Sequence, residues 1–273
     1  MDNKLKIETP FSLKDTLESG QFFLFDYDNK NDLYYLVHGN NLIKLKQENN
    51  LLYHNLNNNQ HIIDLFNLEQ NYDKIIHETK DEYLIEAYSK YSGLKLMKVD
   101  LWQTIIGFVC SSNANIPKIK NNLKLISEFF GEVIELDNKK YYTFPKPGKI
   151  DDIELLIKAK TGYRSKYIYA INSIINEDPN YLQKLEKLTY LESKNELMKL
   201  PGVGPKVADC ICLFGLGHTE AFPIDTWIKK ALEDIYLKEK VSNKELSEFV
   251  EKNFGENKGI KQQIIFHYIR NNN

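Results

Sequence analysis

The sequence predicts an α+β protein in which the strands come first and the helices later. Between Gln21 and Asn55, runs rich in aromatic and branched residues alternate with polar turns, which is typical of an antiparallel β-meander. After Gly93, nearly every segment has the hydrophobic period of an amphipathic helix. The 273 residues, 42% of them hydrophobic, suffice for two cores. We therefore expect a β-rich domain at residues 1–93 and an all-helical domain at residues 94–273.

Four strand-like runs make up the predicted meander, the last of them the weakest. They are Gln21–Tyr27, Leu33–His38, Leu42–Gln47 and Leu51–His54. The turns at Asp28–Asp32 and Gly39–Asn41 contain the Asp, Asn and Gly residues that favour chain reversal.

Ten amphipathic segments are predicted as helices in the second domain. They are Val99–Ser111, Pro117–Phe130, Ile150–Lys160, Ser165–Asn176, Tyr181–Thr189, Ser193–Leu200, Pro205–Gly215, Thr226–Leu237, Asn243–Asn253 and Gly259–Ile269.

Composition excludes several classes of protein. The longest strongly apolar stretch, Cys210–Leu216, is far shorter than the roughly 20 residues that cross a bilayer, and Met1–Pro10 lacks the apolar core of a signal peptide. We therefore expect no membrane partner and a cytoplasmic protein, associated with the nucleoid if the source is a prokaryote. The three cysteines cannot form a fully paired disulfide framework, and they are one short of the four thiolates that usually hold an iron–sulfur cluster.

The charge is unevenly distributed along the chain. The net charge is −2, but residues 101–210 carry 16 Lys and Arg against 13 Asp and Glu, whereas residues 1–100 carry 11 against 16. A surface for nucleic acid would therefore be local and lie mainly in the middle segment. Almost all basic residues are Lys, and Arg occurs only at Arg164 and Arg270.

The most informative stretch is Leu200–Cys210, which reads Leu-Pro-Gly-Val-Gly-Pro-Lys-Val-Ala-Asp-Cys. It follows a helical run, turns on two glycines and begins a new helix with Pro205 in the first turn, so it predicts a helix–hairpin–helix. The backbone around Gly202, Gly204 and Val207 can approach a DNA phosphate, because free N–H groups at a helix start attract anions. An ordinary corner between two helices is the alternative interpretation of a bare Gly-x-Gly turn.

The carbonyl groups that precede the new helix form a second candidate site in the same hairpin. Those of Met198, Leu200 and Val203 can point together at a monovalent cation that bridges to the phosphate.

Lys206 and Asp225 are the candidate catalytic residues. Lys206 lies in the first turn of the second hairpin helix, where the positive end of the helix dipole disfavours an ammonium and favours a nucleophilic amine. Asp225 stands where the next amphipathic helix begins, so N-capping alone explains it. A capping carboxylate also has a fixed direction, and if it faces Lys206 it can stabilise a positively charged sugar.

These residues resemble the helix–hairpin–helix DNA glycosylases. The hairpin Lys, the Val-Ala-Asp-Cys sequence, the Pro-Ile-Asp at 223–225 and the β-rich N-terminus are together similar to the 8-oxoguanine DNA glycosylase/AP lyase family. The resemblance spans roughly Phe11 to Phe266. It implies a TATA-binding-protein-like antiparallel sheet followed by a helical catalytic domain.

The resemblance also implies a pocket for the damaged base. Ser19-Gly20-Gln21 matches the motif in which the glycine carbonyl accepts N7–H of 8-oxoguanine, a proton that guanine lacks. Gln262 matches the reader of the Watson–Crick edge, and Phe266 and Cys210 match the two stacking walls. Gln262 and Phe266 are four residues apart, so they project from one helix face. Without the family, Phe266 and Cys210 would be interpreted as core residues.

Three further positions match residues that contact DNA. Asn113, within Phe108–Ile116, corresponds to the residue that enters the gap left by the extruded base, and Tyr163 and Arg164 correspond to a wedge and to a contact for the orphan cytosine. Two positions depart from the family pattern. Lys118 replaces a second Arg for the cytosine, so strict selection for cytosine is not implied, and Trp227 replaces a His that faces a phosphate.

The sequence therefore predicts a monomeric, bifunctional glycosylase that excises 8-oxoguanine from double-stranded DNA. Lys206 would displace the base at C1′ and form a Schiff base, and β-elimination would nick the strand. This chemistry requires no redox cofactor or catalytic metal. The alternatives are a glycosylase of the same superfamily for another damaged purine and a non-catalytic helix–hairpin–helix DNA-binding protein.

Overall fold

The N-terminal half contains a five-stranded antiparallel sheet. The computed structural model describes residues 3–272. The strands are β1 (Asn3–Lys6), β2 (Phe25–Asp28), β3 (Leu33–His38), β4 (Asn41–Glu48) and β5 (Leu51–His54). Their order is β1-β5-β4-β3-β2, so β2 to β5 form the predicted meander and β1, which the sequence analysis missed, pairs with β5 at one edge.

Strand β2, which was predicted to begin at Gln21, begins at Phe25. Residues 21–24 are not part of the sheet, because the buried amide of Gln21 holds the chain elsewhere: it donates to the carbonyls of Lys95 and Thr16, and its oxygen accepts from Met97 N–H. Strand pairing in β2 therefore starts at Phe25.

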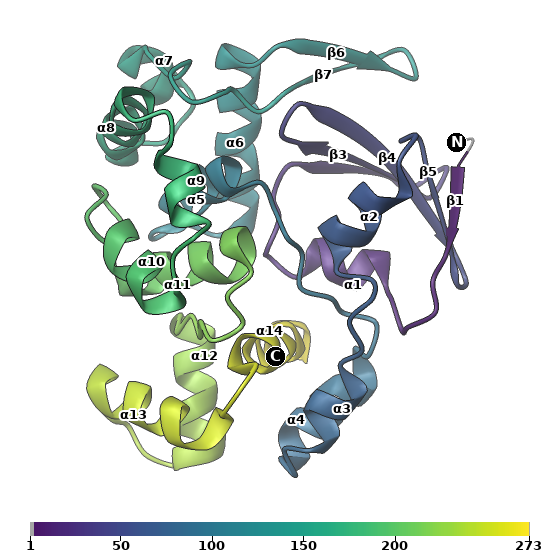
Figure 1. Ribbon diagram of the computed structural model, residues 1–273, viewed down its shortest axis with the longest axis vertical. Helices are drawn as coiled ribbons and strands as arrows, with labels where there is room; N and C mark the ends of the chain where they lie inside the picture. The colour runs from purple at the N-terminus through teal and green to yellow at the C-terminus, as the bar shows by residue number, and fades with distance from the viewer. Residues whose placement is uncertain (1–2, 273) are drawn as a thin grey trace.

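The helices of the N-terminal half cover the sheet and lead to the second half. They are α1 (Leu13–Glu18), α2 (Asn59–Phe66), α3 (Asp73–His77) and α4 (Glu82–Lys90). Figure 1 shows α1 and α2 against the sheet and α3 and α4 below it.

The C-terminal half is mainly helical, as predicted. Its helices are α5 (Leu101–Ser111), α6 (Ile116–Phe130), α7 (Ile153–Lys158), α8 (Arg164–Glu177), α9 (Tyr181–Leu185), α10 (Tyr190–Leu197), α11 (Pro205–Ile211), α12 (Thr226–Ala231), α13 (Asn243–Phe254) and α14 (Lys258–Asn272). Two π-helical segments, η1 (Cys212–Leu216) and η2 (Leu232–Leu237), continue α11 and α12, so the predicted helices Pro205–Gly215 and Thr226–Leu237 are not α-helical throughout.

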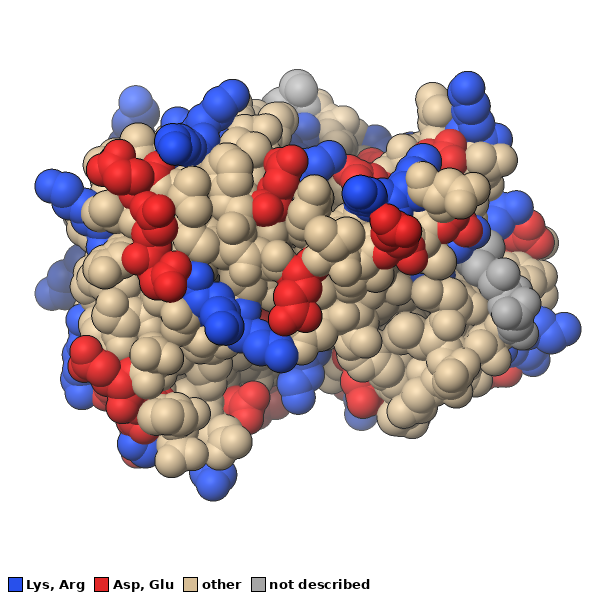
Figure 2. Space-filling view, turned by 90° about the horizontal axis from the view of Figure 1, so that it is seen from above, with Lys and Arg blue, Asp and Glu red and all other residues tan. Residues whose placement is uncertain are grey.

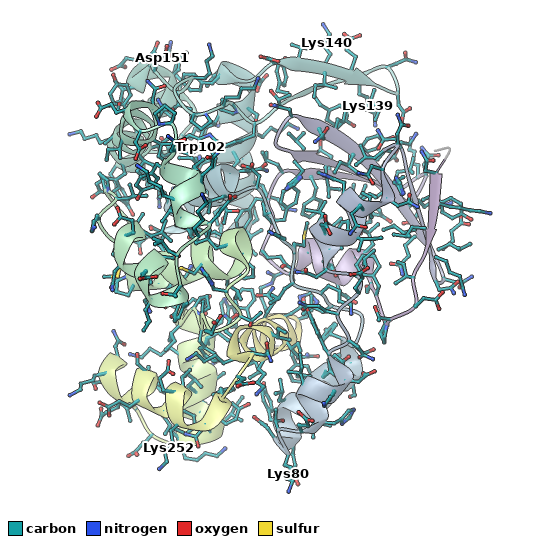
Figure 3. The ribbon with its side chains drawn as sticks, viewed as in Figure 1. Lys80, Trp102, Lys139, Lys140, Asp151 and Lys252 are labelled. Carbon is teal, nitrogen blue, oxygen red and sulfur yellow. The ribbon has the colours of Figure 1, made fainter. Side chains whose placement is uncertain are left out.

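A β-hairpin interrupts the helical half, and here the prediction of helices alone was wrong. Strands β6 (Val133–Leu136) and β7 (Lys139–Tyr142) are joined by Asp137 and Asn138, both with positive φ. That turn suits a two-residue hairpin, but it lacks the Asn-Gly or Asp-Gly signal. The hairpin extends toward β3 and β4, with Lys139 and Lys140 near its outer end (Figures 1 and 3), and the Tyr35 hydroxyl of β3 donates to Asp137 at 2.7 Å.

The core is continuous across the two halves. Helix α5 is buried from Leu101 to Cys110 and packs against α6, α8, α11 and η1. Trp102 lies inside the helical half, where its indole N–H donates to the Pro145 carbonyl at 2.8 Å (Figure 3). Helix α14 returns to pack against α4 of the first half. Because buried side chains connect both halves, the domain boundary at residues 93 and 94 stays a prediction. Within residues 3–272, no helix combines the length and the apolarity that a membrane span requires.

Candidate active site and DNA interface

The predicted hairpin lies between α10 and α11. Helix α10 ends at Leu197, and α11 begins with Pro205 at its first position after Gly204, whose place as N-cap leaves the helix without a side-chain cap. A Cβ atom on Gly204 would meet nothing within 4 Å, so the first N–H groups of α11 are approachable there. The side chain of Val207 is buried, so a contact to phosphate would use its backbone.

The carbonyls proposed to hold a cation lie in the same turn. The carbonyl of Leu200 accepts the N–H of Val203 at 3.1 Å, which closes the turn, and Met198 caps α10. The cation site at Met198, Leu200 and Val203 stays a prediction.

Lys206 and Asp225 face one cleft from two different helices. The Lys206 amine lies 5.7 Å from the Phe108 ring centre and close to the Cys210 thiol, one turn along α11. Asp225 is the N-cap of α12, as predicted, and its carboxylate accepts from Ile228 N–H at 2.9 Å. Burial raises the pKa of Asp225 above its usual value, and the Ile228 bond and the nearby Lys206 oppose that rise.

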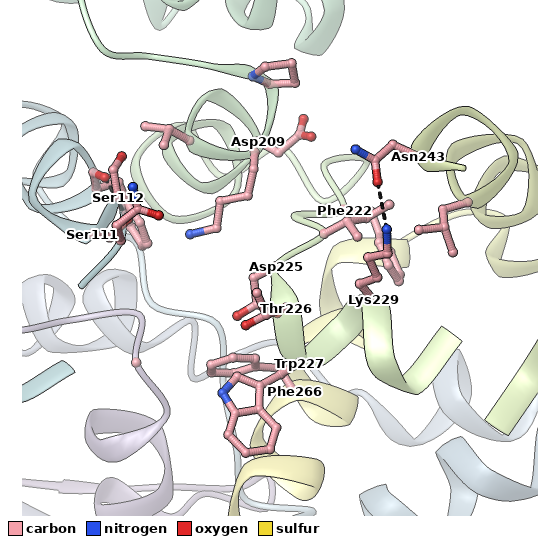
Figure 4. A pocket seen from close by; sticks show the side chains of 18 of the residues that line it. Ser111, Ser112, Asp209, Phe222, Asp225, Thr226, Trp227, Lys229, Asn243 and Phe266 are labelled. Atoms are coloured by element: carbon pink, nitrogen blue, oxygen red, sulfur yellow. Dashed lines mark hydrogen bonds between the residues drawn. The ribbon is translucent and has the colours of Figure 1, made fainter. Parts of the chain in front are cut away.

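The cleft has a volume of about 1430 Å³ and collects residues from distant parts of the chain. Six predicted site residues line it, from α1–β2, α5–α6, α11, α12 and α14. They are Gly20, Asn113, Lys206, Val207, Asp225 and Phe266. Figure 4 shows Asp225 and Thr226 at the start of α12 and Asp209 on the α11 side of the cleft. Asp209 was not predicted as a cleft residue.

Asp209 belongs to a polar cluster that also lines the cleft. It accepts the Tyr190 hydroxyl at 2.7 Å and pairs with the Lys194 ammonium at 2.8 Å. Burial raises the pKa of Asp209, and the pair with Lys194 opposes that rise. The only available signal was the spacing of Tyr190 and Lys194 on one helix face, which is too common to predict a site.

Gly20 lines the cleft and has a positive φ of 82°. Two side chains of α14 hold the backbone before it: Gln263 donates to the Ser19 carbonyl at 3.0 Å, and Arg270 donates to the Glu18 carbonyl. The Arg270 guanidinium also lies 5.6 Å from the ring centre of Phe266. Sequence reasoning missed Arg270, although it is one of two arginines in the chain.

Gln262 and Cys210 are buried behind the cleft surface. Gln262 is 4% exposed and donates to the Pro223 carbonyl at 3.1 Å, while its side-chain oxygen has no hydrogen-bond partner among the described residues. A buried acceptor without a partner costs about 1–3 kcal/mol, so a ligand with N–H donors would recover that energy. The N1–H and N2–H groups on the Watson–Crick edge of a guanine-type base are such donors. Burial raises the pKa of the Cys210 thiol to about 11, so the thiol is neutral at pH 7.

Asn113, Tyr163 and Arg164 contact one another where the start of α8 meets the loop after α5. Asn113 has a positive φ and donates to the Tyr163 hydroxyl at 3.4 Å, and Tyr163 is 52% exposed. Arg164 is only 2% exposed, and it donates to the carbonyls of Ser112 and Thr161. The guanidinium therefore binds backbone carbonyls of the protein itself. Lys118 lies in the first turn of α6, outside the cleft lining.

The surface charge is mixed. Figure 2, which looks down on the end with α6, α7 and the β6–β7 hairpin, shows Lys and Arg interspersed with Asp and Glu. This face does not present a single large positive surface, in agreement with the net charge of −2.

Known proteins share this fold. Residues 4–105 match the family model of the 8-oxoguanine DNA glycosylase N-terminal domain, and residues 192–214 match a helix–hairpin–helix motif. The structure of MBOgg1 with a low-affinity DNA ligand has a TM-score of 0.93 and 34% identity, covering 98% of this chain and 95% of that one. The 8-oxoguanine glycosylase/lyase of Clostridium acetobutylicum, bound to double-stranded DNA with cytosine opposite 8-oxoguanine, has a TM-score of 0.91 and 31% identity, covering 96% and 93%.

The chain belongs to the 8-oxoguanine DNA glycosylase/AP lyase family. A probable N-glycosylase/DNA lyase of Methanothermobacter thermautotrophicus is 26% identical over 234 residues, 77% of this chain and 73% of that protein. The predicted family and the predicted fold, a sheet followed by a helix–hairpin–helix domain, are thus confirmed.

Two positions set this glycosylase apart from the family pattern given above. Trp227 lines the cleft two residues after Asp225 and is 36% exposed, so an apolar ring with one N–H donor stands there. Lys118 has its backbone N–H capped by the Asn115 side chain at 3.0 Å, and its own side chain is exposed. Both side chains are exposed.

Proposed function

We propose that this protein is a bifunctional DNA glycosylase/AP lyase that excises 8-oxoguanine from duplex DNA in base excision repair and then nicks the strand. The observation that carries the proposal is the meeting of Lys206 and Asp225 from two helices in one cleft, which Gly20 and Phe266 from other elements also line. A nucleophile, a carboxylate, a base-reading carbonyl and a stacking ring are thereby available to one extruded nucleotide.

The chemistry follows from these positions. The Lys206 amine attacks C1′ of the sugar, a C–N bond to the lysine forms, and the glycosidic bond to the base breaks, with the base leaving together with its bonding electrons. The departing base takes up the proton that the new secondary ammonium releases. The Asp225 carboxylate stabilises the positive charge that develops on the sugar. Ring opening gives a Schiff base between Lys206 and C1′. Loss of a proton from C2′ then expels the 3′ phosphate and cuts the strand.

Base selection rests on Gly20 and Gln262. The Gly20 carbonyl is an acceptor, so it bonds N7–H of 8-oxoguanine and repels the N7 lone pair of guanine. The buried oxygen of Gln262 accepts from the Watson–Crick edge. Asn113, Tyr163 and Arg164 would fill the gap in the duplex. One chain supplies all of these residues, so we propose that a monomer acts, in the cytoplasm and at the nucleoid if the source is a prokaryote.

Borohydride trapping tests this proposal. The protein is incubated with borohydride and a duplex carrying one 8-oxoguanine opposite cytosine, beside an undamaged duplex. The Lys206→Gln variant is compared with Lys229→Gln, a matched change of another lysine in the same cleft. We expect a covalent adduct on the damaged duplex with the wild type and with Lys229→Gln, and none with Lys206→Gln although it still binds the duplex.

Two results would contradict the proposal. An adduct that persists in Lys206→Gln would exclude this lysine as the nucleophile. Absence of both adduct and base release in the wild type would favour a DNA-binding module or a glycosylase for another lesion.

A further inference from the structure

Two exposed tyrosines stand one helical turn apart at the start of α8. Tyr163 precedes the first residue of the helix and Tyr167 follows four positions later, so both lie on one face. Their rings are 6.1 Å apart at 81°, an edge-to-face arrangement. Tyr167 is 37% exposed, and nothing in the function proposed above uses it.

The Tyr167 ring also packs against the hairpin between α10 and α11, which is proposed to bind a DNA phosphate. A Cβ atom on Gly202 would lie 2.5 Å from Cδ2 of Tyr167 and 2.8 Å from its Cγ. Only a glycine fits under the ring at this place, and its φ of 77° also favours glycine. The ring of Tyr167 therefore contacts both Gly202 and the ring of Tyr163.

Tyr163 has few other supports. Its hydroxyl lies 3.3 Å from the Ser112 carbonyl and 3.4 Å from the amide nitrogen of Asn113, both weak contacts, and the Arg164 guanidinium lies 4.6 Å from its ring centre. A row of contacts thus runs from the loop that carries Asn113, through Tyr163 and Tyr167, to Gly202.

We propose that Tyr167 is a positioning residue that couples the hairpin between α10 and α11 to Tyr163, the residue that enters the duplex as a wedge. When the hairpin grips a DNA phosphate, the rigid ring of Tyr167 fixes where Tyr163 enters the duplex. An aromatic ring suits this role because it has only two side-chain torsions and transmits a displacement without bending. The inference rests on the proposed function, since it assigns Tyr163 to the duplex and Gly202 to the phosphate.

The first test distinguishes insertion of Tyr163 into the duplex from binding of the protein to the DNA backbone. Tyr167→Leu and Tyr167→Ala remove the ring, and Tyr167→Phe keeps it as the matched control. Base extrusion is followed by the fluorescence of 2-aminopurine placed beside 8-oxoguanine, affinity is measured on an undamaged duplex, and excision is measured in a single turnover. The melting temperature of each variant identifies any that does not fold.

Loss of the ring should slow extrusion and excision by about 3- to 10-fold, the range expected for one aromatic pair. Affinity for the undamaged duplex should stay within about twofold, because the hairpin backbone is intact. Tyr167→Phe should behave as the wild type. An equal loss of undamaged-duplex affinity would make Tyr167 a plain DNA contact, and unchanged extrusion would remove the coupling; either result overturns the proposal.

A double variant tests the contact itself. Gly202→Ala places a methyl group into the Tyr167 ring and should weaken extrusion, and adding Tyr167→Ala should restore part of the loss. Strictly additive losses would overturn the coupling. Failure of the proposed function is recognised separately, because wild-type protein would then form no borohydride adduct on a duplex with a preformed abasic site.

Discussion

Substitution of Gly20 tests how the protein recognises the damaged base. The size of the expected effect can be estimated from the backbone conformation at Gly20. Its φ is 82°, and an L-residue in the left-handed region costs roughly 1–2 kcal/mol. A Cβ atom there would lie 3.0 Å from Cδ1 of Ile116, 3.1 Å from Nη1 of Arg270 and 3.4 Å from Cε1 of Phe266. These are ends of side chains that can yield by a few tenths of an ångström, so the backbone term dominates. In Gly20→Ala, the backbone relieves this conformational strain by rotating, which moves the carbonyl away from its position.

The misplaced carbonyl should lose its bond to N7–H of the base. Leaving such a bond unmade costs about 1–3 kcal/mol, so single-turnover excision of 8-oxoguanine should fall by about 5- to 150-fold. Strand cleavage at a preformed abasic site should stay near the wild-type rate, because no base is read there.

Gly217→Ala is the matched control. Gly217 has a φ of 78°, no atoms within 4 Å of the position that an added methyl group would take, and no place in the cleft lining, so the change brings similar backbone strain without touching the site. The melting temperature should fall by a similar amount in both variants, and the rate of excision should fall only in Gly20→Ala. Excision at the wild-type rate in Gly20→Ala, or an equal loss in Gly217→Ala, would refute the reasoning.

Three other changes give distinct outcomes. Asp225→Asn should keep the cap on Ile228 and the melting temperature, because Asn caps as well as Asp, but excision should fall about 100-fold or more. Burial raises the pKa of Asp225, so the carboxylate is lost on acidification at a higher pH than for an exposed Asp near 3.9; the acid limb of the excision profile should lie above that value and vanish in the Asn variant. Arg164→Ala should lower the preference for cytosine over adenine opposite the lesion, which excision from the two duplexes measures; unchanged ratios would remove it from recognition. Arg270→Met removes the bond to the backbone before Gly20 and the contact with Phe266, so excision should fall several-fold with abasic-site cleavage retained; equal losses in both assays would indicate a general defect.

The sequence predicted the features that depend on neighbouring residues. The meander from β2 to β5 follows from alternating strand-like runs and turns, and the hairpin follows from two glycines with Pro205 at the first helical position. The N-cap role of Asp225 could be predicted in the same way, because a cap requires only the residue and the helix that follows it. The shared face of Gln262 and Phe266 comes from helical spacing alone.

Other features were decided by contacts between residues far apart in the chain. Gln263 and Arg270 reach across more than 240 residues to the carbonyls before Gly20, and no local pattern encodes such a bond. The burial of Arg164 against the Ser112 carbonyl depends on how α8 packs on the loop after α5. Likewise, Gln21 leaves the sheet because its amide finds partners around Lys95.

One physical cause explains why the first group of features could be predicted from the sequence and the second could not. Periodicity, caps and turn residues act within a few positions, so the order of residues along the chain determines which helices and strands form and which chemical groups they carry. Which of those groups face one another depends on how the helices and the sheet pack, and that packing is settled by burial summed over the whole core. The sequence alone therefore determined the lysine, the aspartate and the hairpin, and only the tertiary structure placed Lys206, Asp225 and Gly20 around one cleft.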